Sequence, residues 1–424
     1  MQTVAIVSSD HQRTTDQPAR RAVFSALEVP GFGLLWVSGA LWHISRWGIA
    51  FLSAYLVNDL TDSPRLVQLT GAVMWTPLLL GGVLGGVIAD RFDRRRTVLL
   101  QMAIITPLVA VIAVLVERET IEVWMLYPFL FVVGIGWVFD MTSRRSLVFD
   151  VVGPAQIDNA MALESLSLSG GIALGTLLGG SVISLFGVGS AFGVVAVLLC
   201  VAGLLLWRVD PPPATVSAGT STPIADLRDG VRLLRTHRGL VGILGVTVIA
   251  NFFYFAYFPL VQVIADELDV GAFLTGLLAS ATGLGMMGGS LLVARLQPRR
   301  RGIVYLTGVF LGMALLVGFA TLRWYPAALA FLLGSSIGGG LFGSTQSTLV
   351  MTTVDAVVRG RALGLLSMAI GALPVGMFLL GELAKVTGPG AAITTFSVAG
   401  TVLLAAWKRR HPEVAGMDAG PSPV

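Results

Sequence analysis

The chain has 424 residues, of which 55% are hydrophobic and 12% are charged, whereas about 25% of the residues are charged in an average soluble domain. Apolar runs of about 20 residues, each long enough to cross a lipid bilayer, recur along nearly the whole sequence. This composition excludes a single soluble globular domain and predicts an all-α polytopic membrane protein.

The chain begins with a polar segment that lacks the basic and apolar regions of a signal peptide, so we expect no cleaved leader. Twelve apolar runs follow, and each predicts one membrane span. The first six spans are expected at 33–57, 66–89, 97–116, 123–146, 159–183 and 188–207. The second six are expected at 239–262, 271–294, 302–321, 326–350, 363–384 and 389–407.

The distribution of Lys and Arg predicts the orientation of these spans. If the N-terminus is cytoplasmic, 23 Lys and Arg residues lie on the cytoplasmic side and four on the opposite side, as the positive-inside rule requires. Both termini are therefore expected in the cytoplasm, and the protein is expected in a bacterial inner membrane. The net charge of +4 follows from this asymmetry, so no nucleic-acid partner is needed to explain it.

The longest polar stretch divides the chain into two halves. Within it, Ile224, Leu227, Val231 and Leu234 fall on one face of a predicted helix, opposite several arginines. This helix either lies on the inner membrane surface or is a solvated linker. The expected organisation is a tail at 1–30, a six-helix bundle at 31–208, a linker at 209–238, a second bundle at 239–408 and a tail at 409–424.

The two halves also resemble each other in sequence. Residues 175–192 align without gaps on residues 376–393, and five small residues coincide. Residues 85–96 have a weaker counterpart at 289–301, at a similar offset of roughly 200 residues. A repeat of six-span halves is typical of secondary transporters, in which the substrate site lies between the halves.

Two motifs resemble those of the major facilitator superfamily of transporters. The loop after span two is similar to the family signature Gly-x-x-x-Asp-Arg-x-Gly-Arg-Arg, with Asp93 replacing its second glycine, and the matching residues are Gly86, Asp90, Arg91, Arg94 and Arg95. Span five is similar to the exporter motif Gly-Pro-x-x-Gly-Gly, with Thr176 replacing the proline, and its glycines are Gly171, Gly175, Gly179 and Gly180. The stretches 60–73, 139–165, 223–235 and 359–368 resemble the enterobactin-exporter-like and macrolide-efflux-like branch.

This resemblance implies two six-helix bundles related by pseudo-twofold symmetry, the major facilitator fold. It implies a monomeric secondary transporter that exports an amphiphilic drug, macrolide or siderophore-like molecule by alternating access, coupled to proton antiport. An uptake symporter for organic anions and a non-transporting sensor derived from the fold stay open as alternatives. The resemblance further implies a gating latch formed by Gly86, Asp90, Arg91, Arg94, Arg95, Asp140 and Arg144.

Ionisable side chains inside a membrane are costly unless they are paired or hydrated, so each is a candidate functional residue. Arg46 in span one either binds an anionic substrate group in a central cavity or pairs with an acid or carbonyl of a neighbouring helix. His43, one turn earlier, is a candidate cavity residue of a type suited to proton coupling, although a structural hydrogen bond also explains it. Asp140 is expected to pair with Arg144 and, like Glu164 at similar depth, is a candidate for gating or proton transfer.

Span seven is rich in aromatic side chains, which suit either a cavity for amphiphilic molecules or ordinary packing. The candidate cavity residues in the second half are Asn251, Tyr254, Gln262 and Gln346. The one cysteine, Cys200, lies in an apolar run and is expected to be a buried small side chain. The sequence contains no nucleotide-binding loop, metal-ligand cluster or catalytic motif, so we expect neither a cofactor nor an enzyme.

Overall fold

The computed structural model describes residues 25–91, 93–210, 232–355 and 358–418, with only the backbone described within 80–91. These residues form helices and no strand, which confirms the predicted all-α class. The first half, which we call the N bundle, contains α1 (Phe32–Thr61), α2 (Pro64–Arg91), α3 (Arg94–Glu117) and α4 (Val123–Trp207). The second half, the C bundle, contains α6 (Arg238–Ile249), α7 (Leu260–Glu267), α8 (Ala272–Leu296), α9 (Arg301–Thr321), α10 (Tyr325–Thr353), α11 (Arg359–Ile370), α12 (Leu373–Thr387) and α13 (Pro389–Arg410).

Helix α4 is 85 residues long and comprises three predicted spans. Its helical geometry breaks at Gly153 and Gly187, whose φ angles are 69° and 85°. Glycine is favoured there because a side chain with a Cβ is strained at positive φ. We refer to 123–152, 154–186 and 188–207 as the first, second and third segments of α4.

Two further spans are assembled from shorter helices. Span seven consists of α6, a π-helical turn at Ala250–Tyr254, a 3₁₀ turn at Phe255–Tyr257 and α7. Span eleven consists of α11 and α12. Together with the three segments of α4, the described residues therefore form the twelve predicted spans. Eight continuous helical stretches among them are apolar enough to cross a membrane, and α4 counts as one of these.

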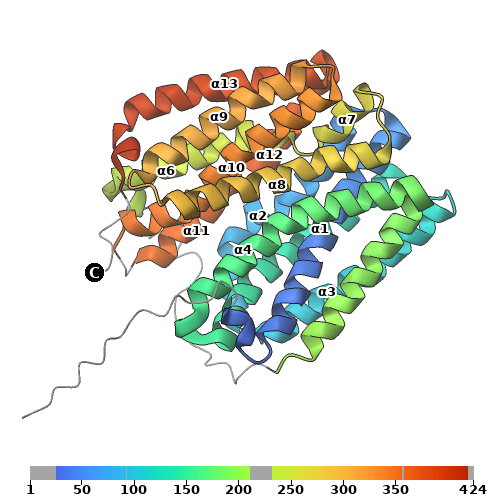
Figure 1. The fold of residues 1–424 in the computed structure, drawn as a ribbon, viewed down its shortest axis with the longest axis horizontal. Coiled ribbons are helices and arrows are strands. Elements are labelled where there is room, and N and C mark those ends of the chain that lie inside the picture. The colour runs from blue at the N-terminus through green and yellow to red at the C-terminus, as the bar shows by residue number, and fades with distance from the viewer. Residues whose placement is uncertain (1–24, 92, 211–231, 356–357, 419–424) are drawn as a thin grey trace, which may run out of the picture.

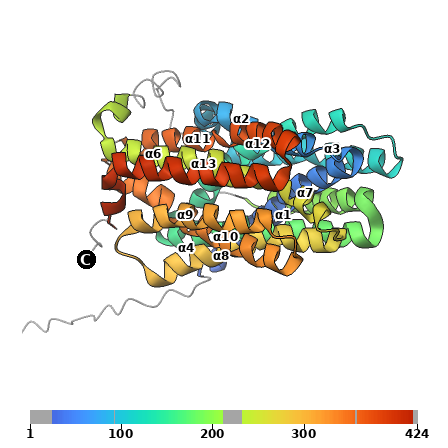
Figure 2. The ribbon, with the colours of Figure 1, turned by 90° about the horizontal axis from the view of Figure 1, so that it is seen from above.

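The two bundles lie side by side, with α12 against α2 and α8 against α4 (Figure 1). In the view from above, helices of the C bundle overlie much of the N bundle, so the two halves overlap in the picture (Figure 2). We call the end of the molecule where α1 begins and α13 ends the terminal face, and the end with the turn between α1 and α2 the distal face. The terminal face is the side predicted to be cytoplasmic.

The bundles are joined in their distal halves. Gly180 of α4 and Gly276 of α8 approach so closely that a Cβ on either would clash with the backbone of the other. Such small residues let helices pack tightly in lipid. Two hydrogen bonds and one ion pair join the bundles on this side: Gln68 Nε2 to Ala256 O (2.9 Å), Gln262 Nε2 to Phe51 O (3.4 Å) and Arg65 Nε to Glu382 Oε1 (2.5 Å). The structure is therefore closed at its distal face.

The segments outside the spans differ from expectation in two respects. The expected tail after residue 409 folds back onto the C bundle, where Gly302 N donates a hydrogen bond to Met417 O (3.1 Å). Cys200 is exposed rather than buried, because it lies on the outer apolar face of the third segment of α4 with Val197 and Leu204. The predicted surface helix near 224–234 falls mainly on residues 211–231, which are outside the described part of the chain.

Candidate functional site

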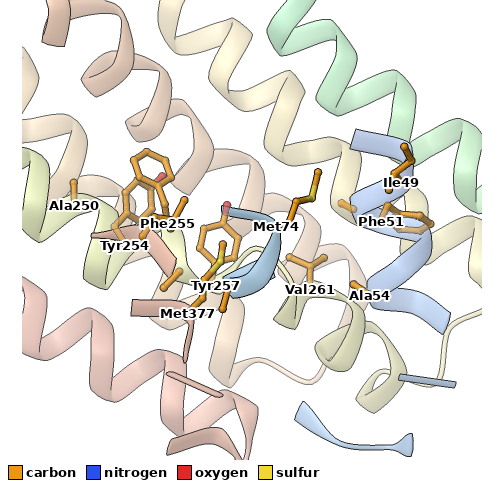
Figure 3. Close-up of a cluster of buried hydrophobic side chains, with 14 of the residues drawn as sticks. Ile49, Phe51, Ala54, Met74, Ala250, Tyr254, Phe255, Tyr257, Val261 and Met377 are labelled. Carbon is orange, nitrogen blue, oxygen red and sulfur yellow. The ribbon is translucent and has the colours of Figure 1, made fainter. Parts of the chain in front are cut away.

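A small central space lies between the bundles, on the distal side of Arg46. It measures about 70 Å³ and is lined by residues of α1, α2, α4, α7, α8 and α12. Figure 3 shows five wall residues that converge from four of these helices: Phe51, Ala54, Met74, Val261 and Met377. Gln262 provides an amide to this otherwise apolar lining. Because sites for drug-sized ligands usually enclose about 300–1,000 Å³, the bundles must separate further before such a molecule fits.

Arg46 is fully buried next to this space, and none of its guanidinium nitrogens has a hydrogen-bond partner among the residues that the structure describes. The guanidinium carbon instead lies 4.8, 4.9 and 4.1 Å from the ring centres of Trp47, Trp75 and Trp137. Cation–π contacts of this kind stabilise a desolvated cation. Within the described part of the chain, Arg46 therefore has neither an acid nor a carbonyl as a hydrogen-bond partner. Trp47 and Trp75 also line the central space, so Arg46 lies directly behind its wall.

A second group of buried charges lies nearer the terminal face. Arg144 Nη2 is 2.7 Å from Asp140 Oδ1, and Gln101 Nε2 donates a longer hydrogen bond of 3.4 Å to the same oxygen. Glu164 is 9% exposed, and its Oε1 has no hydrogen-bond partner. Arg144 Nη1 and Glu164 Oε1 flank the same point on Gly39 of α1, so the second segment of α4 adds another carboxylate beside the ion pair.

His43 lies one helical turn from Arg46 and is 8% exposed. Its Nδ1 has no hydrogen-bond partner, so the expected structural hydrogen bond to that nitrogen is not formed. The backbone and Cβ of His43 pack against Gly171 of α4. This position places the imidazole between the caged arginine and the Asp140–Arg144 pair along α1.

Two arginines of the loop motif pair with acidic residues of the N-terminal half. Arg94 Nη1 binds Asp150 Oδ2 at 2.5 Å, and Arg95 contacts the Trp207 carbonyl and, at 3.5 Å, Asp210. Asp93 caps α3 by accepting a hydrogen bond from Arg96 N (2.7 Å), which is a local reason for an acid where the family motif has glycine. Gly86, Asp90 and Arg91 lie at the end of α2, where only the backbone is described, so the structure gives no side-chain partners for them.

The exporter-like glycines hold the second segment of α4 against its neighbours. Gly171 and Gly175 pack on the backbone of α1 near Ile44, and Gly179 packs on Phe51. Gly180 faces the C bundle at Ala272 and Gly276. The motif thus spans both the interior of the N bundle and its contact with the C bundle.

Three of the four candidate cavity residues in the C bundle do not line the central space. Asn251 Nδ2 donates to Thr247 O (2.9 Å), Gln346 Nε2 donates to Thr247 Oγ1 (3.1 Å), and Tyr254 donates to Ser335 O (2.6 Å). Figure 3 shows Tyr254 away from the wall residues of α1. The π and 3₁₀ turns change the angular spacing along span seven, so a regular helical pattern misplaces Asn251 and Tyr254. Only Gln262 reaches the space.

Sequence reasoning missed several residues of the site. The three tryptophans of the cage come from α1, α2 and the first segment of α4, and only Trp47 is adjacent to Arg46 in sequence. Gln101 could not be singled out, because nothing in the sequence shows that α3 packs its amide against Asp140. Asp150 had a clearer signal, since it precedes the turn at Gly153 and hence lies at the same face as the arginine cluster.

Comparison with known proteins gives a consistent result. A family model described as Major Facilitator Superfamily matches residues 35–379. Macrolide efflux protein A of Streptococcus pyogenes is 21% identical over 82% of this chain and 88% of its own length. The enterobactin exporter EntS of Shigella flexneri is 25% identical over 88% of this chain and 86% of its own length.

The fold is similar to that of solved transporter structures. A bacterial homologue of the human lysosomal transporter Spinster, solved in an inward-facing and unoccupied conformation, superimposes with a TM-score of 0.70. That match covers 93% of this chain and 98% of the other, at 16% sequence identity. These relatives are transporters and not enzymes.

Proposed function

The chain belongs to the major facilitator superfamily, and from this premise we propose that it exports an amphiphilic small molecule from a bacterial cytoplasm. It is a multi-pass membrane transporter with efflux proteins among its relatives. The proposal places it in the inner membrane as a monomer with both termini cytoplasmic, and includes drugs, macrolides and siderophore-like compounds among its substrates.

The observation that best supports this proposal is the buried, hydrogen-bond-free Arg46 behind the apolar wall of the central space. Burying a guanidinium without hydrogen bonds costs free energy. A substrate that supplies a hydrogen-bond acceptor to Arg46 would therefore gain binding free energy. Aromatic and aliphatic walls next to one such cation fit an amphiphile with a polar or anionic group.

The closed distal face supports alternating access. With the bundles joined on that side, substrate would enter the central space from the terminal face, the predicted cytoplasmic side. Export then requires the distal contacts to break and the terminal side to close. The Asp140–Arg144 pair and the loop arginines lie at the terminal side, where we assign them the role of latch.

Proton antiport is the driving reaction that we propose, and Glu164 is its best candidate carrier. Asp140 is held by Arg144, whereas Glu164 keeps one carboxylate oxygen without a hydrogen bond and can accept a proton without losing that ion pair. In Glu164→Gln we expect export to lose its dependence on an imposed pH gradient while facilitated efflux persists. Glu267→Gln, at the distal face, is the control, and unchanged coupling in Glu164→Gln would remove this assignment.

Everted and right-side-out membrane vesicles separate the proposed direction from its alternatives. Radiolabelled erythromycin and a fluorescent catecholate siderophore are presented to each under an imposed proton gradient. We expect accumulation in everted vesicles only. Accumulation only in right-side-out vesicles would support organic-anion uptake with Arg46 as the anchor, and gradient-dependent movement in neither would favour a non-transporting sensor.

A further inference from the structure

The membrane-facing side of the N bundle has a groove between α3 and the first segment of α4, near the terminal face. Its open space measures about 480 Å³, well within the roughly 300–1,000 Å³ of typical ligand sites. Leu100 and Ile104 are 62% and 47% exposed, so the groove opens to the surrounding lipid. Its apolar walls are formed by Leu100, Ile104, Ile105, Val132, Ile135 and Phe139.

Polar groups lie at two levels of this groove. Arg96 and Asp93 both lie exposed at its mouth, where Asp93 Oδ1 accepts a hydrogen bond from the backbone N of Arg96. The Arg96 side chain is in no ion pair with any residue whose side chain is described, whereas Arg94 and Arg95 each have an acidic partner. Gln101 lies five residues further along α3, about 7.5 Å at the rise of an α-helix. Gln101 lines the groove but is only 5% exposed, and its Oε1 is buried beside Gly136 with no hydrogen-bond partner among the described residues.

A buried acceptor without a donor is costly, so this site favours an occupant that supplies one. The acyl chains of a phospholipid fit the apolar walls but have no hydrogen-bond donor at the depth of Gln101. The better match is an amphiphile with an anionic end for Arg96, a hydroxyl or amide N–H for Gln101 Oε1, and an apolar body.

We propose that the groove is a lateral entry site for the transported amphiphile, which reaches it from the membrane leaflet at the terminal face. The inference rests on the proposed export function and names a second place where the same substrate binds. The groove lies apart from the central space, and the two share no lining residue.

The groove is connected to the buried charges through one side chain. Gln101 Nε2 donates to Asp140 Oδ1, and Asp140 is the partner of Arg144. A donor on the substrate that binds Oε1 polarises the amide and strengthens its bond to the carboxylate, because linked hydrogen bonds reinforce one another. Occupation of the groove would therefore act on the ion pair that we assign to the latch.

Photolabelling of the purified full-length protein in phosphatidylcholine nanodiscs tests the site. The probe is N-dodecanoyl-glycylglycine with a diazirine in its acyl chain, which has a carboxylate, amide donors and an apolar body. We expect saturable labelling of peptides containing 100–105 and 132–139, displaced by unlabelled probe. Ile104→Trp, which fills the groove, should lower this labelling at least fivefold, while Val111→Trp, an exposed position of α3 outside it, should not.

A probe with both amide nitrogens methylated tests the role of Gln101. Because it cannot donate, it should bind the wild type about fivefold more weakly, the usual worth of one hydrogen bond. In the variant Gln101→Leu, the methylated probe and the parent probe should bind equally well. This comparison separates the effect of the donor on the probe from the effect of losing the Gln101–Asp140 contact. Equal binding of the two probes to the wild type would overturn the proposed contact.

The entry role and the export function fail in different ways. Displacement of the probe by phosphatidylglycerol as readily as by unlabelled probe would show a lipid-filled groove and overturn the proposal. Equal export rates in Ile104→Trp and the wild type would overturn the entry role alone. Absence of export by the wild type in everted vesicles would overturn the proposed function, whatever the labelling shows.

Discussion

The N bundle and the C bundle bury polar side chains in different ways. The N bundle buries charged groups, and Arg46, Asp140, Arg144 and Glu164 are all less than a tenth exposed. The C bundle buries neutral groups that bind one another, such as Thr247 Oγ1, which lies 2.7 Å from the Tyr305 hydroxyl and accepts from Gln346. Both bundles thus have a polar interior, but only the described part of the N bundle has an ionic one inside the membrane.

The two interiors also differ in how completely they are hydrogen-bonded. Among the described residues, nearly all buried side-chain nitrogen and oxygen atoms without a partner lie in the N bundle, and the C bundle has only Gln262 Oε1 and Ser397 Oγ. Unmet hydrogen bonds are costly and are tolerated where water, substrate or a moving part completes them. This difference supports the proposal that substrate and proton chemistry depend mainly on the N bundle, with the C bundle as a supporting framework.

Breaking the ionic interior should have the largest effect on stability. Asp140→Asn leaves Arg144 buried without its counter-charge, and removing one partner of a buried ion pair usually costs about 3–5 kcal/mol. We expect a correspondingly lower free energy of unfolding in detergent. The double variant Asp140→Asn, Arg144→Met should recover most of the loss because no charge is stranded, and a single variant as stable as wild type would contradict this account.

Replacing Arg46 should lower transport without lowering stability. Arg46→Met removes a buried cation that makes no hydrogen bond to a described residue, so the free energy of unfolding should stay the same or rise. Export should fall about 10- to 100-fold, the worth of one hydrogen bond to a charged group. The matched C-bundle variant Gln346→Met should lose stability and keep transport, and the reverse pattern in the two variants would remove the distinction between the bundles.

The fold could be predicted from the sequence because the spans are marked by hydropathy alone. The turns at Gly153 and Gly187 fall between predicted spans, where the apolar runs are interrupted or glycine-rich. The π and 3₁₀ turns of span seven could not be predicted, since hydropathy does not report which carbonyl a given N–H binds.

The candidate site could be predicted only in part. Arg46 and Asp140 were identifiable because a charge inside an apolar span is conspicuous. The tryptophan cage could not be identified, since Trp75 and Trp137 approach Arg46 only through packing of separate helices. The same limit explains Cys200, because an apolar run does not show which of its faces meets lipid.

Loss of one hydrogen bond in the C bundle should have a smaller effect. Tyr254→Phe removes the donor to Ser335 O, which should lower the free energy of unfolding by about 1 kcal/mol. Transport should persist, since Tyr254 does not line the central space. Thermal unfolding and vesicle export measure the two quantities, and loss of export at unchanged stability would show that the C bundle is more than a framework.

The smallest effect on stability is expected at the ion pair that joins the bundles. Arg65 and Glu382 lie 2.5 Å apart at the distal face, with side chains 46% and 37% exposed. Exposed pairs contribute at most about 1 kcal/mol. This pair forms only while the distal face is closed, so Arg65→Gln should favour opening by up to about fivefold, the equilibrium equivalent of that energy.

Thiol labelling measures this opening directly. Ala54→Cys in a Cys200→Ser background places a thiol in the wall of the central space, and an impermeant maleimide added from the distal side reports access to it. Arg323→Gln is the matched control, because Arg323 pairs with Glu267 at the same face but within the C bundle. Faster labelling in Arg65→Gln but not in Arg323→Gln would show that this pair holds the bundles together. High salt should give the same increase in labelling without the substitution, because salt screens the ion pair. Equal labelling in both variants would mean that the glycine contacts near Gly180 and Gly276 keep the distal face closed without help from charge.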